Sequence, residues 1–236
     1  SNDRQWLIID CGVTFAGEEG LPGVDLILPD IEFLEDKIDS IVGIVLTHAH
    51  EDHIGALGWL WPKLKAPLYA TPFTATLIRD KLRERGIERE VPLHEVPLGG
   101  KLSLGPFELE YLTLTHSIAE PNGIAITTPL GTVLHTGDWK IDPSPQIGAS
   151  TDIVRLRELG DAGVLAMVCD STNVFVEGES GSEQTVREGL KAEIALHKGR
   201  VAVACFASNV ARLQSVCEVA AELGRKVCLV GRSMLR

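Results

Sequence analysis

Short apolar runs alternate with turn-forming residues along the chain, a pattern typical of a protein with many short strands. The clearest strand spans residues 107–114, where apolar and polar positions alternate. The clearest helix runs from Pro72 to Arg85, with proline at its start and Gly86 at its end. Further strands are predicted at residues 6–10, 26–28, 41–46, 67–71, 91–96, 101–104, 123–127, 131–135 and 164–169.

Several of these segments have a predicted place in the fold. Residues 91–96 and 101–104 are expected to be edge strands, and residues 164–169 a buried strand. Residues 123–127 and 131–135 are expected to form a hairpin. A loop is predicted at 15–25, and further helices are predicted at 31–38, from about 54, at 151–159, and from a Ser180–Glu183 capping box to His197.

The pattern changes after residue 180. Residues 201–206 and 227–230 are continuous apolar runs, and between them Val210, Leu213 and Cys217 recur at helical spacing behind Ser208, which can cap the helix. Two buried strands flanking one helix make a parallel βαβ unit. We therefore predict a first domain over residues 1–182, and a linker helix with the first part of a second domain over residues 183–236.

Composition narrows the classes of function. The net charge is −11 and no lysine- or arginine-rich block is present, which argues against a general basic surface for nucleic acid. It does not exclude a narrow groove, since two divalent ions would add about four positive charges. The five cysteines are expected to be small buried hydrophobes in a reducing compartment. With no membrane span or signal peptide visible, we expect a cytoplasmic protein.

One polar cluster has no place in a hydrophobic core. His48, His50, Asp52 and His53 follow directly after the 41–46 strand. Without a cation to share, four ligand-type side chains in one short turn repel or desolvate one another. Imidazole and carboxylate together suit a borderline divalent cation such as zinc. The cluster therefore predicts a metal site.

Later strands also run into ligand-type residues, at His116, Asp138 and Asp170. Strand ends on one edge of a sheet can pool side chains on a rigid support. The predicted metal ligands are His48, His50, Asp52, His53, His116 and Asp138.

The other three histidines are weaker candidates. We expect His94 and His197 to be ordinary surface or core residues. His135 lies close to Asp138 in sequence, so a supporting role near the metal and a purely structural role both stay open.

The motif H-x-H-x-D-H, with a later lone histidine and aspartate, resembles the metallo-β-lactamase fold. Other motifs resemble the β-CASP nucleases of the bacterial ribonuclease J family: THSI at 115–118, LHTGDWK at 134–140, DSTN at 170–173, FASN at 206–209 and GRSM at 231–234. The resemblance covers nearly the whole chain. It implies an α/β fold, an αββα sandwich followed by the opening βαβ of a β-CASP domain.

The resemblance also implies roles for the ligands. His48, His50 and His116 would hold one metal, Asp52 and His53 the other, and Asp138 would bridge them. Asp52, Asp138 and Asp170 are the expected catalytic residues, with Asp170 in a supporting place near the metals. A second set is expected to contact phosphate or orient ligands, although these residue types are also ordinary caps: Ser117, Ser171, Ser208 and Asn209.

The implied activity is hydrolysis of RNA phosphodiester bonds, by endonuclease and 5′-to-3′ exonuclease action in RNA processing and decay. Two ions would lower the pKa of a shared water to about 7. The resulting hydroxide would attack phosphorus in line and break the bond to the 3′ oxygen, which leaves as the 3′ hydroxyl end, while the phosphate stays as a 5′ monophosphate. Asp52 or Asp138 would orient this hydroxide, and no general acid is evident. The expected cofactor is two Zn²⁺, with Mn²⁺ as the alternative. Single-stranded, 5′-monophosphorylated RNA is the expected partner of a full-length homo-oligomer, a dimer or tetramer.

Chains of this family extend beyond both ends of the sequence, so we interpret it as a partial chain whose first domain lacks an initial strand and a closing segment. We expect the second metal, at Asp52, His53 and Asp138, to be weakly held, which leaves the activity of the chain by itself open. Two alternatives also stay open: another metallo-β-lactamase-fold hydrolase, which the Asp170 segment disfavours, and a catalytically silent RNA-binding β-CASP subunit, which retention of the ligands disfavours.

Overall fold

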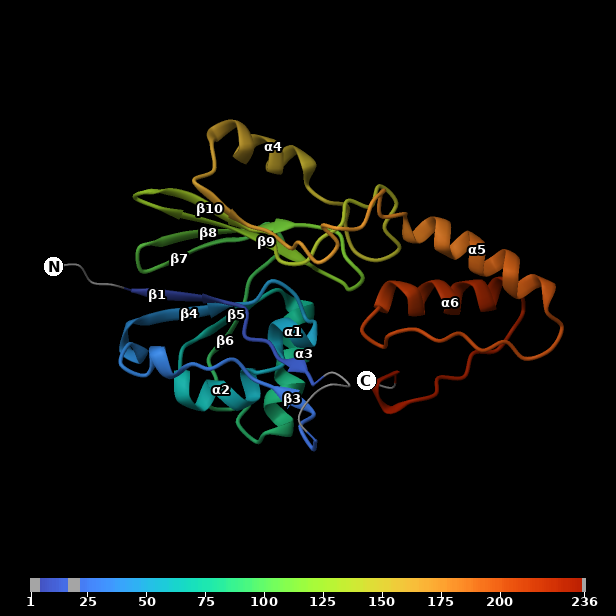
Figure 1. The fold of residues 1–236 in the computed structure, drawn as a ribbon, viewed down its shortest axis with the longest axis horizontal. Helices are drawn as coiled ribbons and strands as arrows, with labels where there is room; N and C mark the ends of the chain where they lie inside the picture. Colours follow the sequence, from blue (N-terminus) through green and yellow to red (C-terminus); the bar gives the residue numbers. More distant parts are fainter. Residues whose placement is uncertain (1–4, 17–21, 235–236) are drawn as a thin grey trace.

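The computed structural model describes residues 5–16 and 22–234. Figure 1 shows two β-sheets that face each other, with helices on their outer faces. The expected αββα sandwich is therefore confirmed. Within the described residues, no helix is long and apolar enough to cross a membrane.

The first sheet is parallel throughout, with strand order β1-β4-β5-β6. Its strands are β1 (Trp6–Ile9), β4 (Ile41–Val45), β5 (Leu68–Ala70) and β6 (Leu93–Glu95). Both faces of β4 are apolar because both are covered: Ile44 packs toward the helices, and Val45 packs toward the second sheet. β4 is thereby a largely buried support for the residues that follow it.

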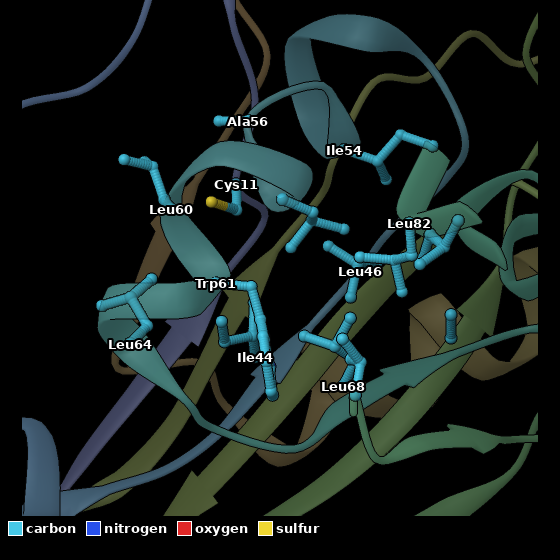
Figure 2. Packing of buried hydrophobic residues seen from close by; sticks show 14 of the residues in the cluster. Cys11, Ile44, Leu46, Ile54, Ala56, Leu60, Trp61, Leu64, Leu68 and Leu82 are labelled. Carbon is cyan, nitrogen blue, oxygen red and sulfur yellow. The ribbon is translucent and has the colours of Figure 1, made fainter. Parts of the chain in front are cut away.

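Three helices cover the outer face of the first sheet: α1 (Glu51–Ile54), α2 (Leu57–Leu64) and α3 (Pro72–Glu84). Figure 2 shows Leu60, Leu64 and Leu82 gathered around Ile44 and Leu68. The apolar stripe predicted for α2 is buried, as its spacing requires. α3 begins at its proline because a missing N–H costs nothing in the first turn.

The second sheet has the order β11-β10-β9-β8-β7 and is antiparallel except for the β10–β11 pair. Its strands are β7 (Lys101–Leu104), β8 (Phe107–Thr113), β9 (Asn122–Thr128), β10 (Gly131–His135) and β11 (Ala166–Val168). β9 and β10 form the predicted hairpin. The edge positions predicted for the strands at 91–96 and 101–104 are also confirmed, since β6 and β7 end their sheets.

The two sheets are joined by a shared apolar layer and by polar contacts. Val45, Leu109 and Ile124 belong to this layer. Within it the Tyr111 hydroxyl donates a hydrogen bond of 3.0 Å to the main-chain oxygen of Tyr69, which links the second sheet to the first.

Helix α4 (Ile153–Ala162) covers the outer face of the second sheet. Leu159 packs against Leu112 and Ala125 of that sheet. The Arg155 guanidinium also forms a bidentate pair with Glu110, at 2.7 and 2.8 Å. The helix is held by both apolar burial and this ion pair.

Two further helices, α5 (Glu183–Leu196) and α6 (Val210–Glu222), lie side by side beyond the sandwich (Figure 1). The Arg187 guanidinium on α5 pairs with Glu218, at 3.2 Å, and with Glu222 on α6. The prediction of strands in a βαβ unit is wrong: in the described part of the chain, residues 201–206 and 227–230 form no β-strand. Two parallel segments alone bury too little to form a stable ladder, and Val230 is 83% exposed.

Other elements differ from their predictions in detail. In place of the helix predicted at 31–38 there are two 3-10 turns, η1 (Glu32–Leu34) and η2 (Ile38–Ser40). Leu34 is the sole buried residue of these turns, so they lack the buried apolar face that would stabilise a longer helix. β11 is exposed rather than buried, since it has β10 as its neighbour on one side and ends the sheet. Part of the predicted 15–25 loop lies outside the described residues. The loop is flanked by a small antiparallel pair, β2 (Thr14–Phe15) and β3 (Leu26–Ile27), and β3 is the strand predicted at 26–28.

The caps and cysteines also need correction. Ser182, not Ser180, caps α5, and Asn209, not Ser208, caps α6 through its side-chain oxygen. Of the cysteines only Cys11 is buried, so the expectation of five buried thiols is wrong. The remaining four lie on exposed or half-buried segments, including the unpaired runs near the C-terminal end.

Paired glycine substitutions test the packing between the sheets. A Cβ added at Gly43 of β4 would lie 2.9 Å from the Tyr69 ring and 3.1 Å from Leu104, so Gly43→Ala is expected to lower the free energy of unfolding by about 1–3 kcal/mol. Gly160→Ala, in α4 with open space around it, is expected to raise it by about 0.5–1 kcal/mol. Urea unfolding of the two variants measures both changes, and equal effects would contradict the described packing.

Candidate metal centre

Three imidazole nitrogens converge beyond the end of β4. His48 Nε2 lies 3.0 Å from His50 Nδ1, and His50 Nδ1 lies 3.2 Å from His116 Nε2. Nitrogen ligands of a tetrahedral zinc ion, each about 2.0–2.1 Å from the metal, lie about 3.3 Å from one another. The three nitrogens thus have the spacing of ligands to one cation.

The local chain explains this convergence. β4 ends at Val45, and the chain then bends at Thr47 and Ala49 before His50, whose own backbone is extended, with φ −72° and ψ 154°, and precedes α1. Along this short bent segment His48 and His50 reach the same place, as predicted, with their ring centroids 4.7 Å apart. His116 follows β8, and its neighbour Thr115 is held by a β-bridge to Lys140.

A second group of ligand-type atoms lies beside the first. His53 Nε2 is 3.2 Å from Asp138 Oδ1 and 3.6 Å from Asp52 Oδ2. The other Asp138 oxygen, Oδ2, is 3.8 Å from His116 Nε2. Asp138 therefore belongs to both groups, and within each group the ligand atoms lie within 4.8 Å of one another. The structure brings all six sequence-predicted ligands together, while their binding of metal stays a prediction.

Asp10 is an additional residue of the site that the sequence analysis missed. Its Oδ1 accepts a hydrogen bond from the Thr47 main-chain N–H (2.8 Å), and its Oδ2 accepts one from the Thr47 hydroxyl (2.8 Å). The same Oδ2 lies 2.7 Å from His53 Nδ1, which turns Nε2 of that ring toward Asp138. Asp10 ends β1, so the rule that strands end in ligand-type residues could have found it.

The turn after Asp10 fits only glycine at position 12. A Cβ on Gly12 would lie 1.7 Å from the main-chain oxygen of Asp52, so the two segments are in backbone contact. The Cys11 N–H donates to the main-chain oxygen of His53 at 2.6 Å. The β1 end and the start of α1 are therefore packed as one unit.

The ring charges suit cation binding. Burial and the neighbouring rings hold the pKa of His48 well below its usual range, and burial lowers the pKa of His116 to about 4. Burial also lowers the pKa of His50. These three imidazoles are therefore neutral at pH 7, as metal ligands must be.

The pKa shifts of His53 and Asp138 favour the charged form of each side chain, unlike the shifts of the three imidazoles above. Burial favours the neutral ring, but the hydrogen bonds to Asp10 and Asp138 outweigh it and raise the pKa of His53 to about 10. The hydrogen bond from His53 lowers the pKa of Asp138. His53 is therefore protonated at pH 7 and pairs with the carboxylates of Asp10 and Asp138.

Asp170 lies near the cluster but in neither ligand group. Its main-chain N–H donates to Thr136 Oγ1 at 3.1 Å, and its Oδ1 accepts from the Thr172 N–H at 2.9 Å. Its charge contributes to the electrostatic environment of His116. A supporting role, rather than direct ligation, stays the prediction.

The predicted substrate-binding residues divide by position. Ser208 reaches the site through its main-chain oxygen, 3.2 Å from His50 Nε2. The main-chain oxygen of Ser117 accepts from the Ala211 N–H at 3.1 Å, and that of Ser171 accepts from the Val174 N–H in a turn. The Asn209 side chain is engaged as a helix cap. Substrate contact by these four residues stays a prediction.

The remaining histidines lie in three different settings. His94 stacks on Tyr69, with ring centroids 5.0 Å apart, and His197 pairs with Glu193 at the surface. Both lie outside the ligand groups, in the ordinary settings expected of them. His135 Nδ1 accepts a hydrogen bond from the Gly137 N–H at 3.1 Å, one residue before Asp138.

Asp10→Asn tests the support of the second ligand group. The amide would place a donor against His53 Nδ1–H or force the proton to Nε2, so the affinity of that group for Zn²⁺ is expected to fall about 10–100-fold. The three-imidazole group should keep its affinity. Titration of the full-length protein against a chromophoric chelator separates the two sites. Asp161→Asn, on the exposed side of α4, is the control, and an unchanged second site would contradict the role of Asp10.

The free energy of unfolding of the metal-free protein should vary with pH, because the pKa values of these histidines differ between the folded and unfolded states. Unfolded histidines bind protons near pH 6.5, whereas folded His116 does so only near 4, so stability falls as the pH drops from 6.5 toward 4. His53 is protonated in both states below 6.5 and adds no slope there; its contribution is lost as the pH rises from 6.5 toward 10. Urea unfolding with chelator present measures both limbs. His116→Gln should flatten the acid limb, and an unaltered slope would contradict the assignment.

Comparisons with known proteins identify the family to which the chain belongs. Residues 1–145 match the family described as Metallo-beta-lactamase superfamily, and residues 198–236 match the one described as Ribonuclease J, beta-CASP domain. A solved protein of unknown function from Enterococcus faecalis V583 has a similar fold, with a TM-score of 0.63, 16% identity, and coverage of 89% of this chain and 57% of its own.

Two curated relatives are named Ribonuclease J. The protein from Sinorhizobium meliloti is 51% identical over 233 residues, and the one from Mycolicibacterium smegmatis is 48% identical over 232 residues. These matches cover 99% and 98% of this chain but 41% of each relative, so the chain spans less than half the length of either. The resemblance seen in the sequence motifs is confirmed, and the chain belongs to the metallo-beta-lactamase superfamily.

Proposed function

We propose that this chain carries the metal centre of a metal-dependent ribonuclease that hydrolyses RNA phosphodiester bonds. The observation that carries the proposal is the pair of ligand groups that share Asp138. A shared carboxylate between two adjacent groups suits two cations a few ångströms apart, the arrangement used in phosphodiester hydrolysis. The similarity to relatives named Ribonuclease J favours RNA as the substrate over other phosphodiesters.

Bound divalent cations would supply Lewis acidity toward phosphoryl oxygens and lower the pKa of a water molecule. His48, His50 and His116 would hold one cation, Asp52 and His53 the other, and Asp138 would contact both. The Asp52 side chain is 62% exposed, so its carboxylate faces the side from which a substrate would approach. Asp138 is half-buried and already accepts from His53, which suits it to orient the attacking oxygen.

The proposal extends to finer properties that follow from the family resemblance. We propose two Zn²⁺ as the cofactor, with Mn²⁺ as the alternative, and single-stranded, 5′-monophosphorylated RNA as the substrate. The proposal also includes endonuclease and 5′-to-3′ exonuclease action, a cytoplasmic location and a homo-oligomeric full-length protein. The imidazole ligands favour Zn²⁺, and the carboxylates would also suit Mn²⁺.

The domain division is also a proposal. Residues 1–182 would form the metallo-β-lactamase domain, and residues 183–236 a linker helix with the first part of a β-CASP domain. The sandwich of two sheets lies in the first range, and α5 and α6 lie in the second. The two family matches, at 1–145 and 198–236, are consistent with this division.

His48→Ala in the full-length protein tests the proposed function. Loss of a fully buried ligand should reduce cleavage of 5′-monophosphorylated RNA by about 10³-fold or more, because the metal-dependent steps fail as a unit. Chelation should reduce the unmodified protein to the same level. His197→Ala, a surface histidine paired with Glu193, is the matched control and should cleave normally.

Each alternative function has a distinct outcome. Cleavage by His48→Ala at the unmodified rate would contradict the metal-centred proposal. Metal binding without cleavage of any RNA, but with RNA retained, would favour the silent RNA-binding subunit. Hydrolysis of a thioester, a lactam or DNA in place of RNA would favour another hydrolase of the same fold.

A further inference from the structure

Helices α5 and α6 are attached to the sandwich through two buried carboxylates. The Asp142 carboxylate accepts hydrogen bonds from the Ser182 hydroxyl (2.6 Å) and the Glu183 N–H (2.9 Å), both at the start of α5. The Glu183 carboxylate in turn accepts two hydrogen bonds from Arg212 of α6, at 3.1 and 3.2 Å. Lys140 Nζ lies 3.5 Å from Asp142 and 3.4 Å from Glu183. We call these five residues the joint.

The joint leads directly to the segment that carries His116. The Asp142 N–H donates to Thr115 Oγ1 at 3.1 Å, and the Lys140 N–H donates to the Thr115 main-chain oxygen at 2.9 Å. On the other side of His116, the Ser117 oxygen accepts from the Ala211 N–H of α6. Both neighbours of this predicted ligand are therefore held by the joint or by α6.

The turn before α6 also reaches His50. The Ser208 main-chain oxygen lies 3.2 Å from His50 Nε2. A carbonyl oxygen can only accept, so this contact places the ring proton on Nε2. The other nitrogen, Nδ1, is then the unprotonated one, and it is the atom that faces His48 and His116.

We propose that the joint is a positioning element for the metal centre: docking of α5 and α6 through Asp142, Ser182, Glu183, Arg212 and Lys140 sets the tautomer of His50 and the place of His116. The three-imidazole site is complete only when the second part of the chain is seated on the first. Asp142 and Ser182 are positioning residues, because they act through Thr115 and the α6 turn. This inference rests on the proposed metal centre and adds a residue set outside its ligands.

Asp142→Asn tests the joint with almost no change in shape. A carboxylate that accepts from the Ser144 and Glu183 N–H groups and the Ser182 hydroxyl becomes an amide with one oxygen, so at least one donor loses its acceptor. Zn²⁺ affinity of the full-length protein, measured by chelator competition, is expected to fall about 10–100-fold. The visible absorption of bound Co²⁺ should change as well, since it reports the geometry of the imidazole ligands.

A second pair of variants distinguishes a specific effect of the joint from general misfolding. Ser182→Ala removes the hydroxyl that binds Asp142 and should weaken Zn²⁺ binding in the same direction, whereas Ser182→Thr keeps a hydroxyl and should restore it. Arg187→Ala is the matched control: Arg187 joins α5 to α6 through Glu218 and Glu222 but does not belong to the joint. It should leave Zn²⁺ affinity and the Co²⁺ spectrum unchanged.

The outcomes separate this inference from the proposed function. Equal metal affinity in Asp142→Asn, Ser182→Ala and the unmodified protein would overturn the inference and leave the metal centre intact. Weakened binding in Arg187→Ala to the same extent would also overturn it, since any loosening of the helices would then suffice. Absence of metal binding in the unmodified protein would overturn the metal centre and the inference together.

Discussion

The contact on which the site depends is the Asp10 carboxylate at the end of β1. It fixes the Thr47 main chain at the end of the neighbouring strand and at the same time the ring of His53. Its backbone lies in the left-handed region, with φ 62°, which costs about 1–2 kcal/mol for a residue other than glycine. Charge-assisted hydrogen bonds from two directions offset this cost. One largely buried carboxylate thereby holds the turn that carries the predicted metal ligands.

The sequence anticipated the sandwich and the clustering of six ligand-type residues because both depend on local pattern. A fully apolar β4 ends just before the first of these residues, and a period of two in β8 leads to His116. Asp10 escaped notice because a single strand-end aspartate is common, and its importance comes from a contact across 43 positions. The prediction of strands at 201–206 and 227–230 was wrong for a related reason. An apolar run indicates a tendency to be buried, but it does not specify the neighbouring strand with which it would pair.

The same limit applies to the ends of helices. Ser180 and Ser208 are good capping residues, yet Ser182 and Asn209 take the caps because Asp142 and the turn against His50 determine where each helix starts. Tertiary contacts thus moved each cap by one or two positions. The net charge of −11 does not extend to the rings of the cluster, where His48 and His116 are neutral and His53 is positive at pH 7. Under the proposed function, positive charge for RNA would come from bound cations rather than from a lysine- or arginine-rich surface.

β11 has a consequence for handling the chain in solution. It is the outermost strand of its sheet, and Met167 and Val168 are more than half exposed, followed by an almost fully exposed Phe175. A sheet edge of this kind offers main-chain donors and acceptors beside apolar side chains, which is a template for an added strand. The open edge of β11 is therefore a position at which an added strand could extend this sheet.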